Sequence, residues 1–564
     1  MPNLIAKEAL VQSTSDTEKS TSSDGSFPHA HLDKEFSPIQ SPEQISRHSR
    51  SRSASRPSSA RDLSRTVSQN GYGIEDDDSS TERDVEAAAA GTISEKDPFE
   101  VEWDGGDDDP MNPRSKSKFS KWIIAILCAV GSLVVTCTSS IYASTYEQIV
   151  PDLHTSQEVA TLGLTLFVLG LAIGPMVLGP LSEFYGRRPI YVVAFAFFVI
   201  WIIPSAVARN IQTLVISRFF DGVAGSAFLT VSGGTVSDLF NRSELQAPMM
   251  LFTAAPFIGP TMGPLIGGFI NQYAYWRWTY YVLLIWSGVI FALIIFFVPE
   301  TYHPVLLKKK AQKIRQETGD DRWRAPIEKL EKSIIRAIGL SLQRPFKLLF
   351  FEQMVTSLCL LSAVLLGTLY LFFGAVPLVM QTNHDFSLSQ SGLSFLGIAI
   401  GCLIGISLDP LFHKNYVRLV EKAAKAGTGP EPEYRLPPAI LGAVLSPIGL
   451  FFFGWTSYAR LPWVLPIIGT GFFGMGVLLS FSGIFTFLVD AYPMYAASAL
   501  AANTFVRCIF AGAFPLFGDQ MYKKLGFQWA SSLLGFLMLA MVPFPFLFFK
   551  YGKGIRARSK MAKS

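Results

Sequence analysis

The sequence predicts an all-α integral membrane protein of twelve transmembrane helices in two six-helix bundles, preceded by a disordered N-terminal tail. Only 16% of its 564 residues are charged, whereas a soluble chain of this length has about a quarter. After residue 121 the apolar residues gather in runs of the roughly 20 residues that a helix needs to cross a bilayer. A charged stretch at residues 299–346 divides these runs into six and six, which indicates two similar halves.

The first 99 residues are rich in Ser, Thr, Asp and Arg and contain few large apolar side chains. They cannot bury enough surface to offset the entropy of ordering, so we expect a disordered cytoplasmic tail. Residues 47–56 are basic and rich in Ser, so kinases are candidate partners there. A solvated tail with no specific role is the alternative. Residues 100–121 form a pre-membrane segment.

The apolar runs place the helices in order along the chain. We expect them at residues 122–143, 159–181, 189–208, 212–236, 246–270, 278–298, 353–380, 390–411, 438–457, 462–488, 495–518 and 527–549. The N-terminal bundle then covers residues 122–298 and the C-terminal bundle residues 347–549. A cytoplasmic central loop at 299–346 joins them, and a basic cytoplasmic tail follows at 550–564.

Lysine and arginine residues gather in alternate loops, which predicts that both termini are cytoplasmic. On this topology the glycosylation sequon at Asn241 lies in a cytoplasmic loop and should stay unmodified. We expect the plasma membrane, with the vacuolar membrane as an alternative. The five cysteines lie inside apolar runs without a CxxC pair, so neither a disulfide framework nor a metal site is expected.

A first motif lies between the second and third helices, at residues 179–189. Gly186 permits a tight turn that a residue with a Cβ would resist. Glu183 can pair with Arg187 or Arg188, or lie at a helix N-terminus. Such a pair can lock one conformation and release it in another; an ordinary basic loop is the alternative.

A second motif places Arg218 and Asp221 inside the fourth helix. A charge within a span is costly and indicates a functional site. Asp221 lies three residues after Arg218 and is its candidate partner. An ion pair that only fixes helix packing is the alternative. Gly222 and Gly225 would let a neighbouring backbone come close.

A third motif, in the fifth helix, spaces glycines and prolines four residues apart. Pro260 and Pro264 each remove an internal hydrogen bond and favour a bend. Gly259, Gly263 and Gly267 form a smooth face for tight packing. The pattern predicts a bent, closely packed gate element.

A fourth motif joins Asp490 to the eleventh helix. Asn503 and Arg507 are four residues apart and share a helical face. Arg507 lies near the middle of this span, so it should face the protein interior. A role in a path through the membrane and a structural pair with Asp490 are equally open.

The chain lacks the sequence patterns of several other classes. No G-x-x-x-x-G-K-[ST] pattern is present, so no Walker-type ATP site is expected. HExxH and G-x-S-x-G are absent too, so we expect no catalytic residues and no enzyme. Four matched pore segments with a filter are also missing, which disfavours a channel. We expect no cofactor, and any active transport must use an ion gradient.

Taken together, these motifs resemble the major facilitator superfamily, and within it the fungal twelve-helix drug:proton antiporters of the polyamine, multidrug and mycotoxin exporter branch. The resemblance covers roughly residues 100–558. It rests on residues 183–188, on Arg218 with Gly222 and Gly225, on residues 259–268, and on the segments 103–113, 299–302 and 490–517. The chain departs from the pattern at Glu183 and Phe184, and the equivalent loop at 408–411 hardly matches.

The resemblance implies two bundles that rock around a central cavity, with protons entering as substrate leaves. It implies that Arg218 couples protonation to substrate movement and that the fifth-helix motif seals the bundle interface. The resemblance thus implies proton-coupled efflux. Most of the 45 phenylalanines are ordinary lipid-facing residues, but aromatic walls suit lipophilic compounds, so we expect drugs or toxins as substrates. A proton-coupled polyamine or nutrient transporter and a non-transporting membrane sensor are the alternatives.

Overall fold

The computed structural model describes residues 98–104, 108–241, 244–328, 334–427, 429–559 and 561–562. Almost all of the tail that the sequence predicts to be disordered lies outside these ranges, as does the basic stretch 47–56. Part of the sequon that begins at Asn241 lies outside them too.

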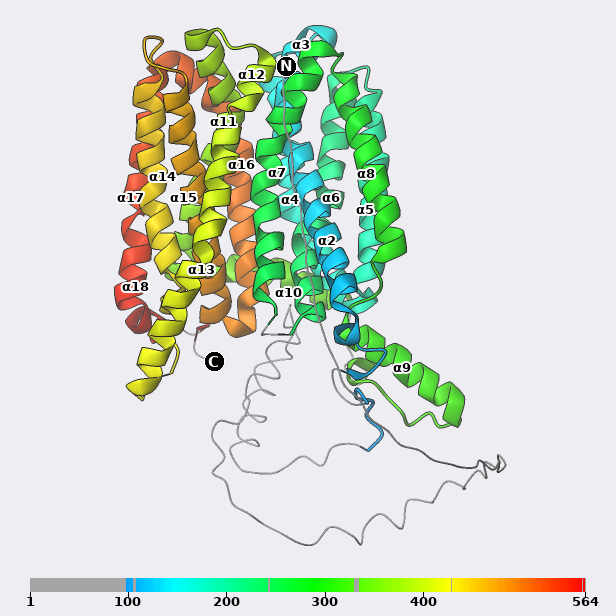
Figure 1. Ribbon diagram of the computed structural model, residues 1–564. Coiled ribbons are helices and arrows are strands. Elements are labelled where there is room, and N and C mark those ends of the chain that lie inside the picture. Colours follow the sequence, from blue (N-terminus) through cyan, green and yellow to red (C-terminus); the bar gives the residue numbers. More distant parts are fainter. Residues whose placement is uncertain are drawn as a thin grey trace, which may run out of the picture. The chain divides into compact units, whose positions relative to one another are not determined.

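The N-terminal half contains six membrane-length helical stretches (Figure 1). They are α2 (Lys118–Ile141), continued by η4 (Tyr142–Thr145) and α3 (Tyr146–Asp152), then α4 (Gln157–Tyr185), α5 (Arg187–Ala206), α6 (Ile211–Leu239), α7 (Gln246–Tyr273) and α8 (Arg277–Phe297).

The C-terminal half contains six more. They are α11 (Gln353–His384), α12 (Leu388–Leu393) with α13 (Leu396–Lys425), α14 (Pro437–Thr456), α15 (Val464–Ala491), α16 (Ala496–Leu525), and α17 (Phe527–Met541) with α18 (Pro543–Arg556). The described part of the chain thus has twelve candidate spans, which confirms the predicted integral membrane fold.

The sequence predicted a loop at residues 299–346, but this segment also contains helices. It contains α9 (His303–Thr318), the short η5 (Pro326–Glu328) and the start of α10 (Ile334–Phe351). A search for long apolar runs misses α9 because it is rich in lysine and glutamine, which favour helices but not membranes. Gly319 ends α9 in the left-handed conformation, with φ 69°.

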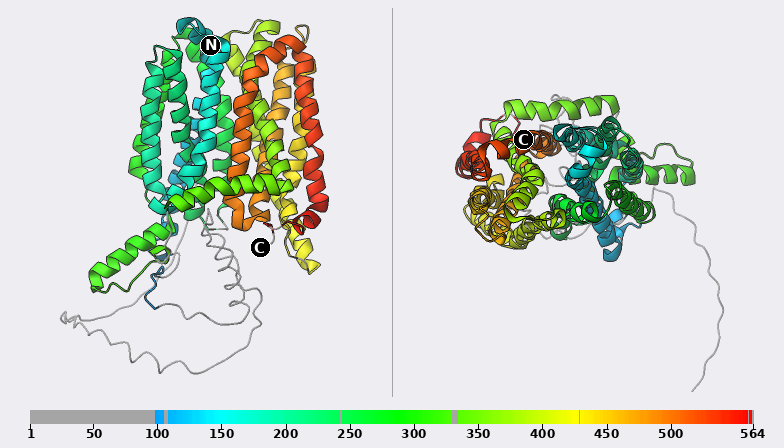
Figure 2. Two further views of the ribbon diagram at one scale, coloured as in Figure 1. Left: turned by 180° about the vertical axis from the view of Figure 1, so that it is seen from behind. Right: turned by 90° about the horizontal axis from the view of Figure 1, so that it is seen from above.

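The two halves use the same helix pairs. In the first half α2 packs on α7, α4 on α6, α5 on α6 and α5 on α8. At the equivalent places of the second half α11 packs on α16, α13 on α15, α14 on α15 and α14 on α17. The end-on view of Figure 2 shows the two groups of helices side by side.

Polar contacts tie the two bundles together at the end that carries α3 and α12. Three side-chain bonds cross there: Gln381 to Glu147 at 3.2 Å, Gln520 to Glu158 at 3.4 Å, and the backbone N–H of Ser389 to Gln272 at 2.8 Å. Deeper in the interface Ser139 bonds Tyr370 at 2.9 Å, and Thr165 donates to Gly512 at 2.8 Å. At the opposite end α10 runs crosswise and contacts both α4 and α16 (Figure 2).

Glycines set the close approach of α4 and α6, which positions the buried charges. A Cβ on Gly222 would overlap the carbonyl oxygen of Phe167, and one on Gly170 would overlap that of Phe219. Without these side chains the two helix backbones touch, as small residues allow in membranes. Arg218 and Asp221 therefore lie in a tightly packed region of the first bundle.

Candidate functional site

Arg218 is fully buried in the first third of α6 and points toward α2. Its guanidinium donates to the carbonyl oxygens of Thr138 at 2.8 Å and Ser139 at 3.1 Å. These carbonyls are in the last turn of α2, where the change to η4 removes the usual i+4 donor. The aromatic rings of Tyr142 and Phe167 lie 4.7 and 4.4 Å from the guanidinium, so the cation is both bonded and enclosed.

Asp221 lies on the same helix and is also fully buried. Neither carboxylate oxygen has a hydrogen-bond partner. The ion pair with Arg218 that the spacing suggested is therefore not formed, because the guanidinium is directed to the α2 carbonyls instead. The hydroxyl of Tyr280 on α8, within electrostatic range of both residues, is buried without a partner as well.

The turn between α4 and α5 is built around Gly186, whose φ is 96°. The Glu300 carboxylate accepts the backbone N–H groups of Arg187 at 2.8 Å and Arg188 at 3.2 Å, and so caps the start of α5. A Cβ on Gly186 would overlap that carboxylate. The predicted tight turn is present, but its anchor, Glu300, was not predicted.

Arg187 forms the ion pair of this cluster with Asp238 at the end of α6, at 3.4 Å. It also donates to Ser182 at 2.7 Å and lies 4.6 Å from the ring of Tyr302. Glu183, the partner expected from the sequence, is buried within electrostatic range of Arg187. The cluster thus joins the ends of α4, α5 and α6 to the segment that precedes α9.

The glycine face of α7 packs against α2. Gly259, Gly263 and Gly267 lie so close to α2 that a Cβ at any of them would overlap its atoms. Pro260 and Pro264 lie within the same helix. The resemblance implied a seal between bundles, whereas these three glycines contact a helix of their own bundle.

The contact of α7 with the other bundle uses neighbouring residues. A Cβ on Gly268 would come within 2.8 Å of the carbonyl oxygen of Leu388 on α12. The carbonyl oxygen of Pro264 lies beside Gly392 in turn. One helix therefore presents separate surfaces to α2 and to α12.

Arg507 is partly buried in α16, near Asn503. Its guanidinium lies 5.4 Å from the ring of Phe481 and 5.3 Å from that of Phe485, both on α15. Asn503 donates to Ser362 of α11 at 2.9 Å, and its carbonyl oxygen has no partner. The two residues do share a region of α16 that faces α11 and α15.

The alternative structural pair of Arg507 with Asp490 is wrong. Asp490 bonds Arg435 of η6 (Pro432–Arg435) at 2.8 Å. Asp490 is next to the last residue of α15, whereas Arg507 lies well inside α16. Their separation along the bundle prevents the contact.

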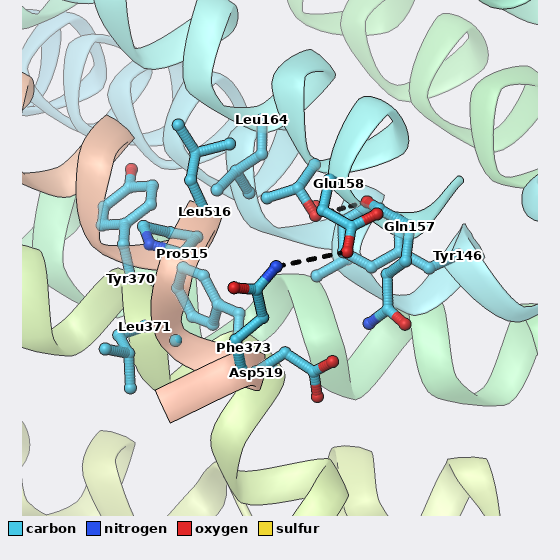
Figure 3. Close-up of a pocket in the computed structure, with 15 residues that line it drawn as sticks. Tyr146, Gln157, Glu158, Leu164, Tyr370, Leu371, Phe373, Pro515, Leu516 and Asp519 are labelled. Carbon is cyan, nitrogen blue, oxygen red and sulfur yellow. Dashed lines mark hydrogen bonds between the residues drawn. The ribbon is translucent and has the colours of Figure 1, made fainter. Parts of the chain in front are cut away.

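A small cavity of about 40 Å³ lies between α4 of one bundle and α11 and α16 of the other (Figure 3). Glu158 and Asp519 place carboxylates at it, and Tyr146, Tyr370 and Phe373 give it aromatic walls. Pockets for drug-sized ligands measure roughly 300–1,000 Å³, so this conformation holds no such ligand here. The sequence reading singled out none of these residues.

A further cluster, also missed, fastens the pre-membrane segment to α9. The buried Lys310 donates to the Asp109 carboxylate at 2.6 Å, to the Asp104 carboxylate at 2.8 Å and to the carbonyl of Glu102 at 3.0 Å. Burial opposes ionisation of Asp109, but the bond from Lys310 and two backbone N–H bonds hold its pKa below the ordinary value. We call these four residues the lysine clasp.

Comparisons with known proteins add to this geometry. The sequence profile described as "Major Facilitator Superfamily" matches residues 128–515. The chain is 53% identical over 460 residues to the efflux pump atB of Aspergillus terreus, which covers 81% of this chain and 89% of that protein. It is 41% identical over 488 residues to the probable drug/proton antiporter YHK8 of Saccharomyces cerevisiae, covering 86% and 94%.

Solved structures show the same fold. The proton:xylose symporter XylE bound to 6-bromo-6-deoxy-D-glucose superposes with a TM-score of 0.56 at 16% sequence identity. The match covers 77% of this chain and 96% of that one. The partially occluded inward-open conformation of XylE from E. coli gives a TM-score of 0.53, also at 16% identity.

Proposed function

The chain belongs to the major facilitator superfamily, and from this membership we propose that it is a proton-coupled exporter of small lipophilic compounds such as drugs or toxins. The efflux pump and the drug/proton antiporter that it resembles, each over more than four fifths of the chain, support export and proton coupling. The buried, unpartnered Asp221 beside Arg218 is the observation that carries the mechanism.

In this proposal Asp221 carries the proton. A buried carboxylate without a hydrogen-bond donor costs several kcal/mol, whereas the protonated acid carries no charge to solvate. When Asp221 loses its proton, the nearest cation to neutralise it is Arg218. That guanidinium holds two carbonyls of α2 through its terminal nitrogens, while its Nε has no acceptor, so in this proposal turning toward Asp221 weakens its hold on α2.

The release of α2 connects the proton to the gate. Because α2 packs along the glycine face of α7, a shift of α2 moves α7 and its contact with α12. The cluster of Glu300, Arg187 and Asp238 keeps the ends of α4, α5 and α6 in register. We also propose that Glu183, Arg188 and Asp490 take part in this gating, because each lies at the end of a helix or in the turn that joins two helices.

We further propose that both termini are cytoplasmic and that the protein resides in the plasma membrane, or alternatively in the vacuolar membrane. The lysine and arginine distribution supports this orientation. The end with α3 and α12 would then be outside, and the polar contacts there would close the outer side. Kinases acting on the Ser-rich tail would regulate the transporter from the cytoplasm.

The test uses inside-out membrane vesicles with an imposed pH gradient and a fluorescent lipophilic compound that is neutral at the assay pH. We expect accumulation that requires an acidic lumen and stops with a protonophore. Reversing the gradient separates export from proton-coupled uptake. Accumulation that ignores the gradient would exclude proton coupling and leave a facilitator.

Substitution of Asp221 sharpens this test. Asp221→Asn should reduce gradient-driven accumulation by at least about tenfold while substrate exchange without a gradient persists, because only the coupling is lost. Asp519→Asn removes a carboxylate of the outer cavity and is the matched control, expected to retain coupling. Full gradient-driven transport by Asp221→Asn would show that Asp221 is not the carrier.

A further inference from the structure

Arg507 is a cation in a membrane-spanning helix without a counter-charge. No hydrogen bond or ion pair to its guanidinium occurs within the described part of the chain, and its Nε is buried without an acceptor. The groups within electrostatic range, Cys359, Tyr370 and Cys508, are neutral thiols and a phenol. An isolated charge inside a membrane protein is costly, so its presence indicates a partner that the described residues do not supply.

Within the described part of the chain, no carboxylate is among the groups that act electrostatically on Arg507, and two carboxylates of the same half are bonded elsewhere. Asp490 holds Arg435 at 2.8 Å. Glu352, which precedes α11, accepts the hydroxyls of Tyr492 at 3.0 Å and Ser559 at 2.6 Å. The interior of the C-terminal half near Arg507 is therefore positively charged, which favours an anion over a cation.

Two aromatic rings flank the guanidinium, and one of them contacts the other bundle. Phe481 and Phe485 lie beside it, and Phe481 also meets Phe257 of α7 with ring centroids 4.8 Å apart. One turn away, Asn503 has an unpartnered carbonyl oxygen. Arg507 thus lies behind the aromatic contact between the bundles, where a substrate would pass when they separate.

If the chain is the exporter proposed above, the geometry points to Arg507 as an anion-binding residue and to lipophilic aromatic carboxylates or similar organic anions as its substrates. A guanidinium binds a carboxylate through two parallel hydrogen bonds, and the flanking rings would stack on the aromatic part of the ligand. An anion that leaves and a proton that enters change the charge of the cell interior in the same direction, toward positive. A membrane voltage that is negative inside therefore drives this exchange together with the pH gradient.

Two probes that share a naphthalene ring test this inference in inside-out vesicles with an acidic lumen. One carries a sulfonate, which stays anionic at every pH used, and the other a trimethylammonium group. We expect Arg507→Met to lower sulfonate accumulation at least about tenfold and to leave trimethylammonium transport unchanged or higher. Arg507→Lys should keep part of the sulfonate transport, because it retains charge but not the planar fork.

Arg460→Met is the matched control, since Arg460 is exposed outside the spans and stacks on Tyr458. It should transport both probes normally. If the unaltered protein moves only the trimethylammonium probe, the anion inference is overturned while the exporter survives. Equal loss of both probes in a stably folded Arg507→Met would assign Arg507 to coupling and also overturn it.

Two other results separate the remaining explanations. If Arg507 holds only chloride, chloride will stabilise the unaltered protein but not Arg507→Met, and the sulfonate will not be moved. A protein that moves neither these probes nor the neutral lipophile under any gradient would contradict the proposed function itself.

Discussion

The N-terminal and C-terminal halves are built from the same helix pairs, yet their interior arginines have opposite surroundings. Arg218 in α6 is fully buried, donates to two carbonyls and lies between two aromatic rings. Arg507 in α16 is partly exposed and has only ring contacts. A cation that is already bonded holds helices together, whereas an unbonded one remains available to a ligand.

The equivalent helices α7 and α16 differ in the same way. Glycines of α7 lie against backbone and hydroxyl atoms of α2, as Gly263 does against Ile141 and Cys137. In α16, Gly518 faces the side chain of Leu371, which is flexible. The distance between α2 and α7 is therefore fixed by backbone contacts. At the equivalent contact between α11 and α16, a side chain can move to make room.

Substitution of the two arginines should give the largest difference. Arg218→Met removes two charge-assisted hydrogen bonds and should destabilise the protein by roughly 3 kcal/mol, with loss of transport. Arg507→Met removes no protein hydrogen bond, so its stability should change by less than about 1 kcal/mol or rise. Thermal unfolding of the purified proteins in detergent, followed by tryptophan fluorescence, measures both.

Equal destabilisation by the two substitutions would contradict the comparison. It would mean that Arg507 has a structural partner in another conformation. Arg218→Lys is a useful intermediate, because a shorter reach and a single ammonium can satisfy at most part of the α2 contact.

The twelve spans could be predicted because the bilayer imposes length and polarity on each helix. The ends agree within a few residues for most of them, as at α5 and α14. The helices α9 and α10 could not be found in this way, since neither is long and apolar enough to be a candidate span. Their sequences favour a helix but lack the long apolar run of a membrane span.

The site could be predicted only where the cost of burying a charge identifies a residue. Arg218, Asp221 and Arg507 stand out on that ground, but spacing alone did not reveal their partners. Arg218 bonds carbonyl groups of α2 that lack their usual helical donor, and they lack it only because α2 changes to η4 there. Asp238 was missed because it lies at a helix end, where a carboxylate is ordinary in sequence. Glu300 was missed because it lies in the connection between α8 and α9, far in sequence from the turn that it caps.

Adding a methyl group to one glycine in each half should give the next largest difference in stability. Gly263→Ala places a methyl group against the α2 backbone, which cannot shift without moving the whole helix. We expect a loss of roughly 1–3 kcal/mol and strongly reduced transport. The methyl group of Gly518→Ala would have the side chain of Leu371 as its nearest neighbour, which can adjust its rotamer, so the cost should be less than about 1 kcal/mol. The unfolding midpoints and transport rates of the two variants test this difference. A Gly263→Ala protein with unchanged stability and transport would contradict the tight contact between α2 and α7.

The smallest effect is expected at the lysine clasp, which binds the pre-membrane segment to α9. Lys310→Gln removes the ammonium that Asp109 and Asp104 share and should speed tryptic release of this segment, with transport retained. Its exposed neighbour gives the control, Lys309→Gln, which should change nothing.

The clasp should also depend on acid in a defined direction. Because the pKa of Asp109 is lowered in the folded protein, its contribution is present above the ordinary value of 3.8 and is lost as pH falls through the lowered value. Protection from an acid-active protease should therefore decline in that range in the unaltered protein. Lys310→Gln should already lack most of this protection at neutral pH and show little further change. An equal acid dependence in both proteins would mean that another carboxylate holds the segment, and that it is anchored through contacts outside the clasp.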